Sequence, residues 1–260
     1  MKRKYKQEWF KENGPLYKIE VSIVNDIVTL MLDTSGDGLH KRGYRKDKGE
    51  APLRENLAAA MVILSKWDGS RIFADPLCGS GTIAIEAALI GNNIAPGLNR
   101  SFVSENWPGM PKDVWQNERN LAKSKIDYKK LSIFASDINR DILEKAKINA
   151  RNAGVLDYII FERKSVQEFY SNQKYGCIVC NPPYGERMGD LKDAEILYRQ
   201  MGETLIKLDT WSFFILSAHP DFQKFFGKTS NRNRKLYNGN LKTYLYQYFG
   251  PLPHKINLSK

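Results

Sequence analysis

The sequence contains no apolar run as long as the roughly 18–20 residues that a membrane-spanning helix requires. Its basic start, residues 1–6, is not followed by the apolar segment of a secretion signal. Only three cysteines are present, which is too few for a disulfide framework and odd in number. We therefore predict a cytoplasmic protein in a reducing compartment, with no membrane partner.

Histidine is scarce as well, with three residues in the whole chain, and none of them adjoins the two motifs described below. Cys177 and Cys180 have the spacing of a redox or metal-binding pair. In an extended strand, however, residues i and i+3 face opposite sides of the sheet. We predict that both cysteines pack in the core and that the chain has no metal site.

Acidic residues are outnumbered, 29 against 40 lysines and arginines, so the net charge is +11. Such an excess favours a polyanionic partner, although a solvated surface biased for solubility is the alternative. The basic residues are partly clustered, at residues 2–11, 40–48, 123–130 and 228–235. Taken with the base-binding motif below, the charge favours a nucleic acid as the partner.

Strands and helices are expected to alternate along most of the chain. The predicted strands are 71–75, 132–137, 158–162, 176–180 and 211–217, and the predicted helices are 52–67, 81–90, 139–152 and 192–208. Residues 235–248 form a hairpin that turns at Asn238-Gly239. We therefore predict an α/β, Rossmann-like fold with a mostly parallel seven-stranded sheet and a C-terminal antiparallel hairpin, which is the layout of class I methyltransferases.

Two segments stand outside this alternation. Residues 1–48 hold a hairpin, turning at Asn25-Asp26, and a basic linker, and we expect them to precede a catalytic domain at 49–260. An isolated hairpin is marginal in water, so it either leans on the main domain or is the remnant of a longer module. The insertion 92–130 is too long for an ordinary connection, and we interpret it as a lid or a substrate-facing element.

The first motif, residues 75–82, reads Asp-Pro-Leu-Cys-Gly-Ser-Gly-Thr and follows an apolar strand. It has two glycines of a dinucleotide loop but lacks the third, which pyrophosphate binding needs. A cofactor without phosphate needs only a backbone that approaches it closely at the sheet edge. S-adenosylmethionine is a cofactor of this kind. Asp137, at the tip of the next strand, can accept both ribose hydroxyl protons, or it can cap the following helix. Ser165 stands where such folds often carry an acid that contacts adenine.

The second motif, Asn181-Pro182-Pro183-Tyr184, ends the strand 176–180. The amide oxygen of Asn181 and the carbonyl of Pro182 can each accept one N–H of a nucleobase amine, and the prolines fix the backbone that aims them. Catalysis would then rest on orientation and preorganised acceptors rather than on a strong base. A paired base cannot reach such a site, so it must be single-stranded or flipped out, with Tyr184 available to stack on it.

These residues resemble the bacterial family of THUMP-domain-linked RNA guanine-N2 methyltransferases, whose members are often labelled N6-adenine-specific DNA methylases. The matching stretches are residues 33–36, 39–45, 51–58, 75–82, 94–98 and 181–187. The resemblance runs from about residue 15 to the end, and it implies methylation of guanine N2 in large-subunit ribosomal RNA. The family carries an RNA-capturing THUMP module ahead of the catalytic domain, and 260 residues leave no room for it. The expectation is a truncated form or gene fragment, with residues 1–48 as one candidate for the remnant of the module, or a form whose docking module is supplied otherwise.

The motifs and the resemblance define three sets of predicted site residues. The cofactor set is Asp75, Pro76, Cys78, Gly79, Ser80, Gly81, Thr82, Asp137, Ile138, Ser165, Val166 and Asn181. The catalytic set is Asn181, Pro182, Pro183 and Tyr184. The RNA-binding set is Lys41, Arg42, Arg45 and Arg187, for which a solvated linker is the alternative. Two other functions stay open: an adenine-N6 methyltransferase acting on DNA, and a catalytically silent RNA-binding or ribosome-assembly factor.

Overall fold

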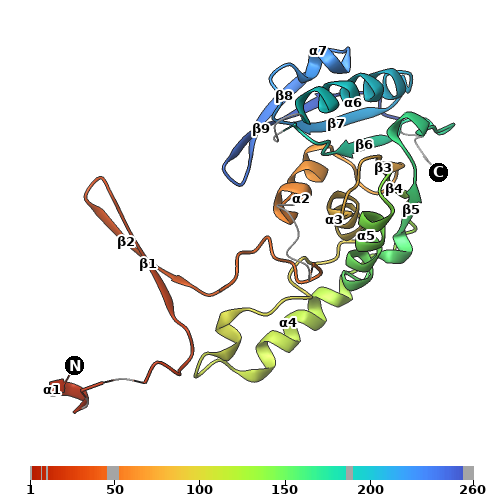
Figure 1. Ribbon diagram of the computed structural model, residues 1–260. Coiled ribbons are helices and arrows are strands. Elements are labelled where there is room, and N and C mark those ends of the chain that lie inside the picture. Colours follow the sequence, from red (N-terminus) through yellow and green to blue (C-terminus); the bar gives the residue numbers. More distant parts are fainter. Residues whose placement is uncertain (1, 7, 10, 46–52, 186–189, 254–260) are drawn as a thin grey trace.

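The computed structural model describes residues 2–6, 8–9, 11–45, 53–185 and 190–253 (Figure 1). Within these ranges the core is a seven-stranded sheet in the order β5-β4-β3-β6-β7-β9-β8. Its strands are β3 (Phe73–Asp75), β4 (Ile133–Asp137), β5 (Ile159–Arg163), β6 (Cys177–Cys180), β7 (Ser212–Ser217), β8 (Arg232–Asn238) and β9 (Leu241–Tyr248). Strands β3 to β7 pair in parallel, whereas β9 runs antiparallel to both β7 and β8. The predicted fold class is confirmed.

Helices cover both faces of this sheet. They are α2 (Glu55–Leu64), α3 (Thr82–Gly91), α5 (Arg140–Asn152), α6 (Asp190–Leu205) and α7 (Phe222–Phe226), with short turns η2 (Leu156–Tyr158) and η3 (Val166–Glu168). One buried cluster joins the sheet to α2, α3 and α5, and a second joins it to α6 and α7 (Figure 1). Nine of the ten residues of α3 are buried, as its all-round apolar sequence predicts. Among the described elements of this body, α7, η2 and η3 were not indicated by the sequence pattern.

The N-terminal hairpin projects away from the body (Figure 1). Its strands are β1 (Lys18–Val24) and β2 (Ile27–Asp33), and the turn lies at Asn25-Asp26, as predicted. Both turn residues have positive φ angles. Apart from Ser22 and Asp33, every residue of the two strands is exposed. The hairpin therefore does not lean on the main domain along its length. Its base is held where the Trp107 indole stacks on Tyr17 and donates to the carbonyl of Leu16 at 2.9 Å.

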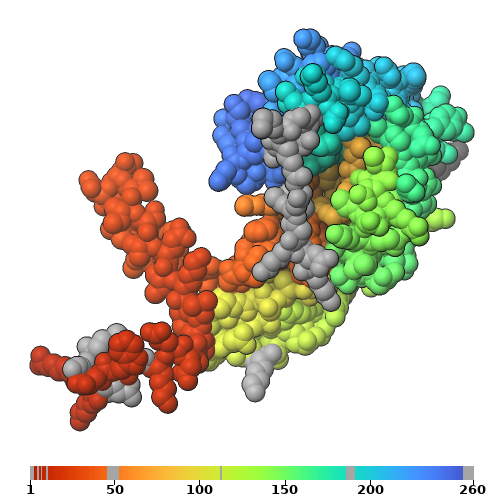
Figure 2. Space-filling model, viewed as in Figure 1, coloured from red at the N-terminus to blue at the C-terminus, as the bar shows by residue number. Residues whose placement is uncertain are grey.

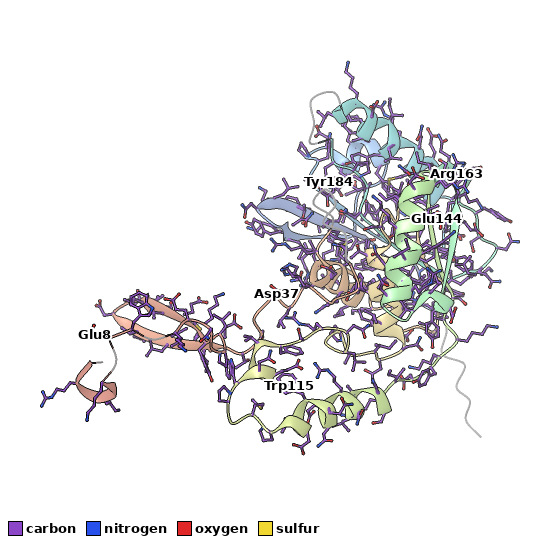
Figure 3. The ribbon with its side chains drawn as sticks, turned by 60° about the horizontal axis from the view of Figure 1, so that its bottom comes forward. Glu8, Asp37, Trp115, Glu144, Arg163 and Tyr184 are labelled. Carbon is purple, nitrogen blue, oxygen red and sulfur yellow. The ribbon has the colours of Figure 1, made fainter. Side chains whose placement is uncertain are left out.

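The insertion 92–130 supports the loop that follows this hairpin. It contains η1 (Val103–Asn106) and α4 (Lys112–Ser124). The guanidinium of Arg100, 9% exposed, donates to the carbonyls of Gly38 at 2.9 Å and Asp37 at 2.6 Å. In Figure 3, Trp115 of α4 lies well apart from Tyr184. The segment around Arg100 thus braces the loop after β2, and Asn99, Arg100 and Ser101 also line the cleft described below. A role of the insertion as a lid or a substrate-facing element stays a prediction.

Candidate active site

The carboxyl ends of the parallel strands open into a cleft of about 1440 Å³. Loops after β3, β4, β5 and β6 all contribute to its lining, as expected where the strand order changes direction in an open α/β sheet. The opposite side is closed by residues of the 37–45 loop, by α6 and by the β8–β9 turn. Both sequence motifs meet in this one cleft.

The glycine loop between β3 and α3 is built on two left-handed residues. Gly79 has a φ of +51° and Gly81 a φ of +81°. A Cβ on Gly81 would lie 3.0 Å from the Cβ of Ala146, so the loop and α5 need this close approach. At Gly79, which lines the cleft, a Cβ would meet nothing nearer than Ile142 at 4.0 Å. Gly79 thus leaves open space for the backbone to contact a ligand.

Asp75, the last residue of β3, lies beneath this loop and is 1% exposed. Its Oδ1 accepts the N–H of Leu77 at 3.3 Å, whereas Oδ2 is buried with no hydrogen-bond partner in the described part of the chain. Burial raises the pKa of this carboxyl well above its usual value, and the nearby Asp137 carboxylate adds to the effect. An orphaned carboxylate oxygen beside a glycine loop suits a ligand that carries a hydrogen-bond donor or a cationic group.

Asp137 ends β4 at the rim of the cleft. Its Oδ2 accepts the N–H of Gly79 at 3.0 Å, so it also ties the two cofactor-side loops together. The alternative role, as the cap of α5, belongs to Asn139, whose side chain accepts from the N–H groups of Asp141 and Ile142. A carboxylate has about four acceptor positions, so Asp137 retains the capacity to bind hydroxyl groups.

Ser165 and Val166 follow β5 and line the same cleft. The Ser165 hydroxyl caps η3 by accepting the N–H of Gln167, and Val166 is 1% exposed. Ile138, which also lines the cleft, is 64% exposed. This edge therefore includes the apolar side chains of Ile138 and Val166, which suit contact with a flat ring.

The second motif follows β6 across the cleft from Asp137. Asn181 Oδ1 accepts the hydroxyl of Tyr184, and this bond fixes the amide relative to the ring. Pro182 is buried and Pro183 is exposed, and all four residues line the cleft. The Asn181 oxygen has a second lone pair, so it can accept an additional N–H from a base.

A buried side chain that the sequence did not indicate supports this loop. The hydroxyl of Tyr198, on α6, donates to the carbonyl of Pro183 at 2.7 Å and lies 3.3 Å from the Ser217 hydroxyl. Tyr198 is fully buried, and burial raises its pKa to about 12. At helical spacing it is indistinguishable from an ordinary core residue, so no sequence signal separates it.

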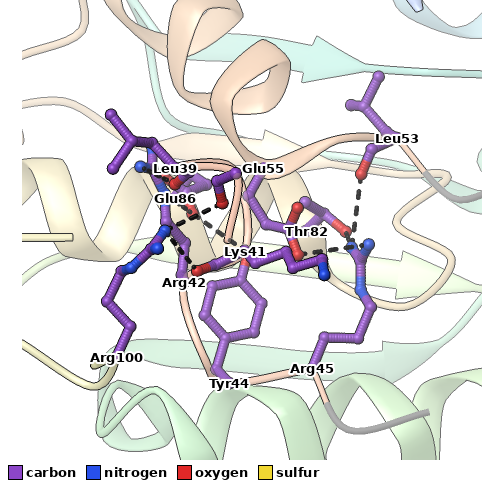
Figure 4. A network of polar contacts seen from close by, with 11 residues as sticks. Leu39, Lys41, Arg42, Tyr44, Arg45, Leu53, Glu55, Thr82, Glu86 and Arg100 are labelled. Atoms are coloured by element: carbon purple, nitrogen blue, oxygen red, sulfur yellow. Dashed lines mark hydrogen bonds and ion pairs between the residues drawn. The ribbon is translucent and has the colours of Figure 1, made fainter. Parts of the chain in front are cut away.

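The arginines of the basic loop are paired within the chain. The Arg42 guanidinium pairs with buried Glu86 at 3.6 Å, and that of Arg45 pairs with Glu55 at 3.4 Å and also donates to the Thr82 hydroxyl (Figure 4). The side chains of Arg42 and Arg45 are 14% and 15% exposed. Each thus has a carboxylate of this chain as its partner, and the RNA contacts expected of this loop stay a prediction.

Two other side chains of the loop, those of Tyr44 and Lys41, also have partners within the chain. Tyr44 is 1% exposed, and its hydroxyl donates to Glu86 at 3.1 Å, so its ring cannot stack on a nucleotide. Lys41 is exposed, lines the cleft and pairs with Asp37 at 3.0 Å. Burial raises the pKa of Glu86 to about 7, although Arg42 opposes the shift. The loop is locked onto α2 and α3 rather than extended toward solvent.

The structure sorts the predicted residues into two groups. The cleft is lined by Lys41, Arg45, Gly79, Asp137, Ile138, Ser165, Val166, Asn181, Pro182, Pro183 and Tyr184. Pro76, Cys78, Ser80, Gly81, Thr82, Asp75 and Arg42 are not part of that lining. Arg187 lies outside the described residues. Lining residues that the sequence did not single out include Arg54, Asn99, Asp193 and Gln200.

The remaining sequence features give no second site. Cys177 and Cys180 are buried and unbridged, which confirms core packing. Within the described ranges, no three His, Cys, Asp or Glu side chains gather where they could bind a metal ion. In the same ranges, no helix has the length and apolar character needed to cross a membrane.

Comparison with protein families gives a match over residues 42–247 to the family described as UPF0020: RMKL-like, methyltransferase domain. The chain is similar to YpsC of Bacillus subtilis (strain 168), named as a candidate RNA methyltransferase, with 50% identity over 93% of this chain and 63% of that protein. It is also similar to the ribosomal RNA large subunit methyltransferase K/L of Legionella pneumophila (strain Lens), with 38% identity over 89% of this chain and 34% of that protein.

Two solved structures share the architecture. SMU.472, described as a candidate methyltransferase complexed with SAH, has a TM-score of 0.86 and 46% identity over 93% of this chain and 64% of its own. A predicted N6-adenine-specific DNA methylase from Listeria monocytogenes has a TM-score of 0.89 and 49% identity over 96% of this chain and 65% of its own. The chain spans less than two thirds of each of these four proteins.

Proposed function

Because the chain belongs to the UPF0020 (RMKL-like) methyltransferase family, we propose that it transfers a methyl group from S-adenosylmethionine to a nucleobase amine of RNA, namely guanine N2 in large-subunit ribosomal RNA. One observation carries the proposal. The segment Asn181–Tyr184 lines the same cleft as Gly79 and Asp137. A base held by the first group would therefore stand next to a cofactor held by the second.

The residues on the cofactor side suit S-adenosylmethionine. Gly79 leaves open space at the cleft floor, and the Asp75 oxygen beneath the loop has no partner among the described residues. We assign the ribose to Asp137 and the apolar edge at Ile138 and Val166 to the adenine ring. When bound, the cofactor would supply an electrophilic methyl group on its sulfonium. The base nitrogen would form a bond to the methyl carbon as the carbon–sulfur bond breaks, the sulfur would leave as a neutral thioether, and the nitrogen would release one proton to water.

The residues on the base side orient the acceptor nitrogen. The lone pair of this nitrogen is delocalised into the ring. The nitrogen is therefore a poor nucleophile until its two N–H bonds move toward tetrahedral geometry. Asn181 Oδ1 and the Pro182 carbonyl accept these N–H groups, and the positive charge that develops on nitrogen strengthens both bonds. Tyr184 and Tyr198 hold the two ends of the loop, so its geometry is set before the base arrives.

RNA is favoured over DNA as the substrate by the names of two relatives. YpsC is named as a candidate RNA methyltransferase, and the Legionella protein is named as a ribosomal RNA large subunit methyltransferase. The name of the Listeria structure keeps adenine N6 of DNA as the second candidate.

The test is mass analysis of nucleosides from a deletion strain and from the strain complemented with the gene. We expect N2-methylguanine to be lost from large-subunit ribosomal RNA and restored by the wild-type gene but not by Asn181→Ala. Loss of N6-methyladenine from DNA, with N2-methylguanine unchanged, would replace our proposal by the second candidate. If calorimetry detected no binding of S-adenosylmethionine to the folded protein, the chain would instead be a silent RNA-binding or ribosome-assembly factor.

A further inference from the structure

The β8–β9 hairpin carries a cluster of cations that the proposed site does not use. Residues 222–253 contain six lysines and arginines and no aspartate or glutamate. All six are exposed: Lys224, Lys228, Arg232, Arg234, Lys235 and Lys242. None of them forms an ion pair with another described residue. In this respect they differ from Arg42 and Arg45, each of which lies within 4 Å of a buried glutamate carboxyl group.

Strand alternation places part of this charge beside aromatic rings. Tyr237 pairs with Lys242 and Lys235 pairs with Tyr244 across the antiparallel ladder, so these four side chains share one face of the hairpin. The Lys235 ammonium lies 5.9 Å from the Tyr237 ring centre, and that of Lys242 lies 5.7 Å from the Tyr244 ring centre. We call Lys235, Tyr237, Lys242 and Tyr244 the hairpin patch.

The patch exposes the groups that bind single-stranded nucleic acid. Tyr237 is 57% exposed, although an aromatic ring gains from burial. Stacking on an aromatic ring tolerates any base, and lysines beside the ring can follow the phosphates. A solvated strand edge would account for the lysines alone, but not for an exposed tyrosine set between two of them.

The patch is also continuous with the cleft. Asn238, Gly239 and Leu241, at the turn of the same hairpin, line the cleft together with Asn181 and Leu197. Figure 2 shows the hairpin, in dark blue, standing at the edge of the body. A strand lying on the patch would therefore lead over the turn toward the second motif.

We propose that the hairpin patch binds the single-stranded RNA segment next to the target base and so guides that base into the cleft. The inference rests on the proposed function, since it assigns the flanking part of the same substrate. The inference assigns the main phosphate contacts to β8 and β9, whereas the sequence pattern had predicted them in the 40–45 loop. Lysine contacts give affinity without sequence preference, so the base itself would still be selected in the cleft.

The test is the affinity of the protein for a labelled oligouridine RNA over a salt series, measured without cofactor. The patch variant is the triple substitution Lys235→Ala, Tyr237→Ala and Lys242→Ala. The matched control is Lys123→Ala, Tyr128→Ala and Lys130→Ala, which removes the same residue types from an exposed region outside the cleft lining. We expect the patch variant to bind at least about tenfold more weakly, since stacking and two cations are lost. Its log–log salt slope should fall by about 1.4, or about 0.7 per lost phosphate contact.

Conservative variants test whether RNA binding depends on the positive charge and the aromatic ring rather than on the exact shape of these side chains. Lys235→Arg with Lys242→Arg, and Tyr237→Phe by itself, should each bind nearly as wild type does. Equal affinities and parallel salt plots for the patch and control variants would overturn the proposal. Absence of wild-type binding to oligouridine at low salt would also overturn it, because such a surface tolerates any sequence.

The failure of this inference is distinguishable from failure of the proposed function. Binding is measured without methyl transfer. If the patch variant bound RNA more weakly but the protein methylated no RNA, only the proposed function would be contradicted. If the patch variant had unchanged RNA affinity and methylated ribosomal RNA as wild type does, only the inference about the patch would be contradicted. Calorimetric titration with S-adenosylmethionine should give equal affinities for all variants and so verifies that their cofactor sites are folded.

Discussion

The hydroxyl of Tyr198 lies 2.7 Å from the carbonyl oxygen of Pro183, and this bond connects α6 to the loop that follows β6. The loop also carries Asn181, so we expect this buried bond to help set where the amide oxygen points. Its ring packs edge-on against His219 and Phe222, which leaves the hydroxyl little freedom. Tyr198 is therefore a positioning residue of the proposed site.

Tyr198→Phe should lower the single-turnover rate of methyl transfer about tenfold, because the Pro183 carbonyl loses the donor that orients it. The KM for RNA should change little, since the base contacts remain. The control is Tyr248→Phe, which removes a comparable buried bond, to the Lys228 carbonyl at 3.1 Å, away from the cleft. Both variants should lose about 1 kcal/mol of stability, so equal rates for the two would show that Tyr198 acts only on stability.

Asp137→Ala should weaken S-adenosylmethionine binding about 10- to 150-fold, because a charge-assisted hydrogen bond to a ribose is worth roughly 1.5–3 kcal/mol. Part of the loss would come through Gly79, whose N–H is held by the same carboxylate. Asn139→Ala is the control, since it removes the cap of α5 without removing a cleft residue. Calorimetry should find the cofactor affinity of Asn139→Ala unchanged. An equal loss in both variants would contradict a direct ribose contact.

The alternation of strands and helices along the chain and the place of the cleft were predictable from the sequence, because both follow from periodicity and from the positions of glycine and proline. The glycine loop and the Asn181–Tyr184 segment each follow a strand of a parallel sheet, and such ends meet at one edge. The antiparallel ending was signalled by Asn238-Gly239, but the turn lies one residue later, at Gly239-Asn240, because Asn238 still pairs with Leu241 in the ladder. Of the two predicted turn residues only Gly239 has a positive φ.

The role of each charge was not predictable in the same way. Lys41, Arg42 and Arg45 look alike along the chain, yet the last two are matched by Glu86 and Glu55 on other elements. Pairing depends on residues distant in sequence, and no local pattern records it. Tyr198 was not predicted for the same reason, because its hydroxyl reaches the Pro183 carbonyl only when α6 packs on the sheet.

The buried Glu86 gives a pH-dependent stability. Burial raises the pKa of its carboxyl from 4.5 to about 7, so the folded protein favours the neutral acid. The stabilisation is complete below about pH 4.5 and is lost as the pH rises through about 7, because the folded state must then ionise a buried group. At about 1.4 kcal/mol per pKa unit, the loss from this group is about 3 kcal/mol.

Glu86→Gln should remove this dependence while keeping an acceptor for Tyr44. Relative to wild type, the variant should gain stability as the pH rises from about 5 to about 8, as measured by urea unfolding. Glu144→Gln is the control, since a hydrogen bond from Lys147 lowers the pKa of the Glu144 carboxyl and places its titration below this range. A constant difference between Glu86→Gln and wild type would mean that Glu86 is ionised throughout.

The amide of Asn181 provides the sharpest test of the chemistry. Asn181→Ala should leave the fold intact, since the side chain is only partly buried and its bond to Tyr184 lies at the cleft. Cofactor affinity should be comparatively spared, because Asp137 and the glycine loop remain. The single-turnover rate should fall about 100- to 1000-fold, as when one preorganised hydrogen-bonding group is removed from a developing charge. Asn181→Asp keeps an oxygen acceptor at the same place and should retain more activity than Asn181→Ala. Radiolabelled methyl transfer to ribosomal RNA from a deletion strain measures all three proteins, and a wild-type rate in Asn181→Ala would exclude the amide from catalysis.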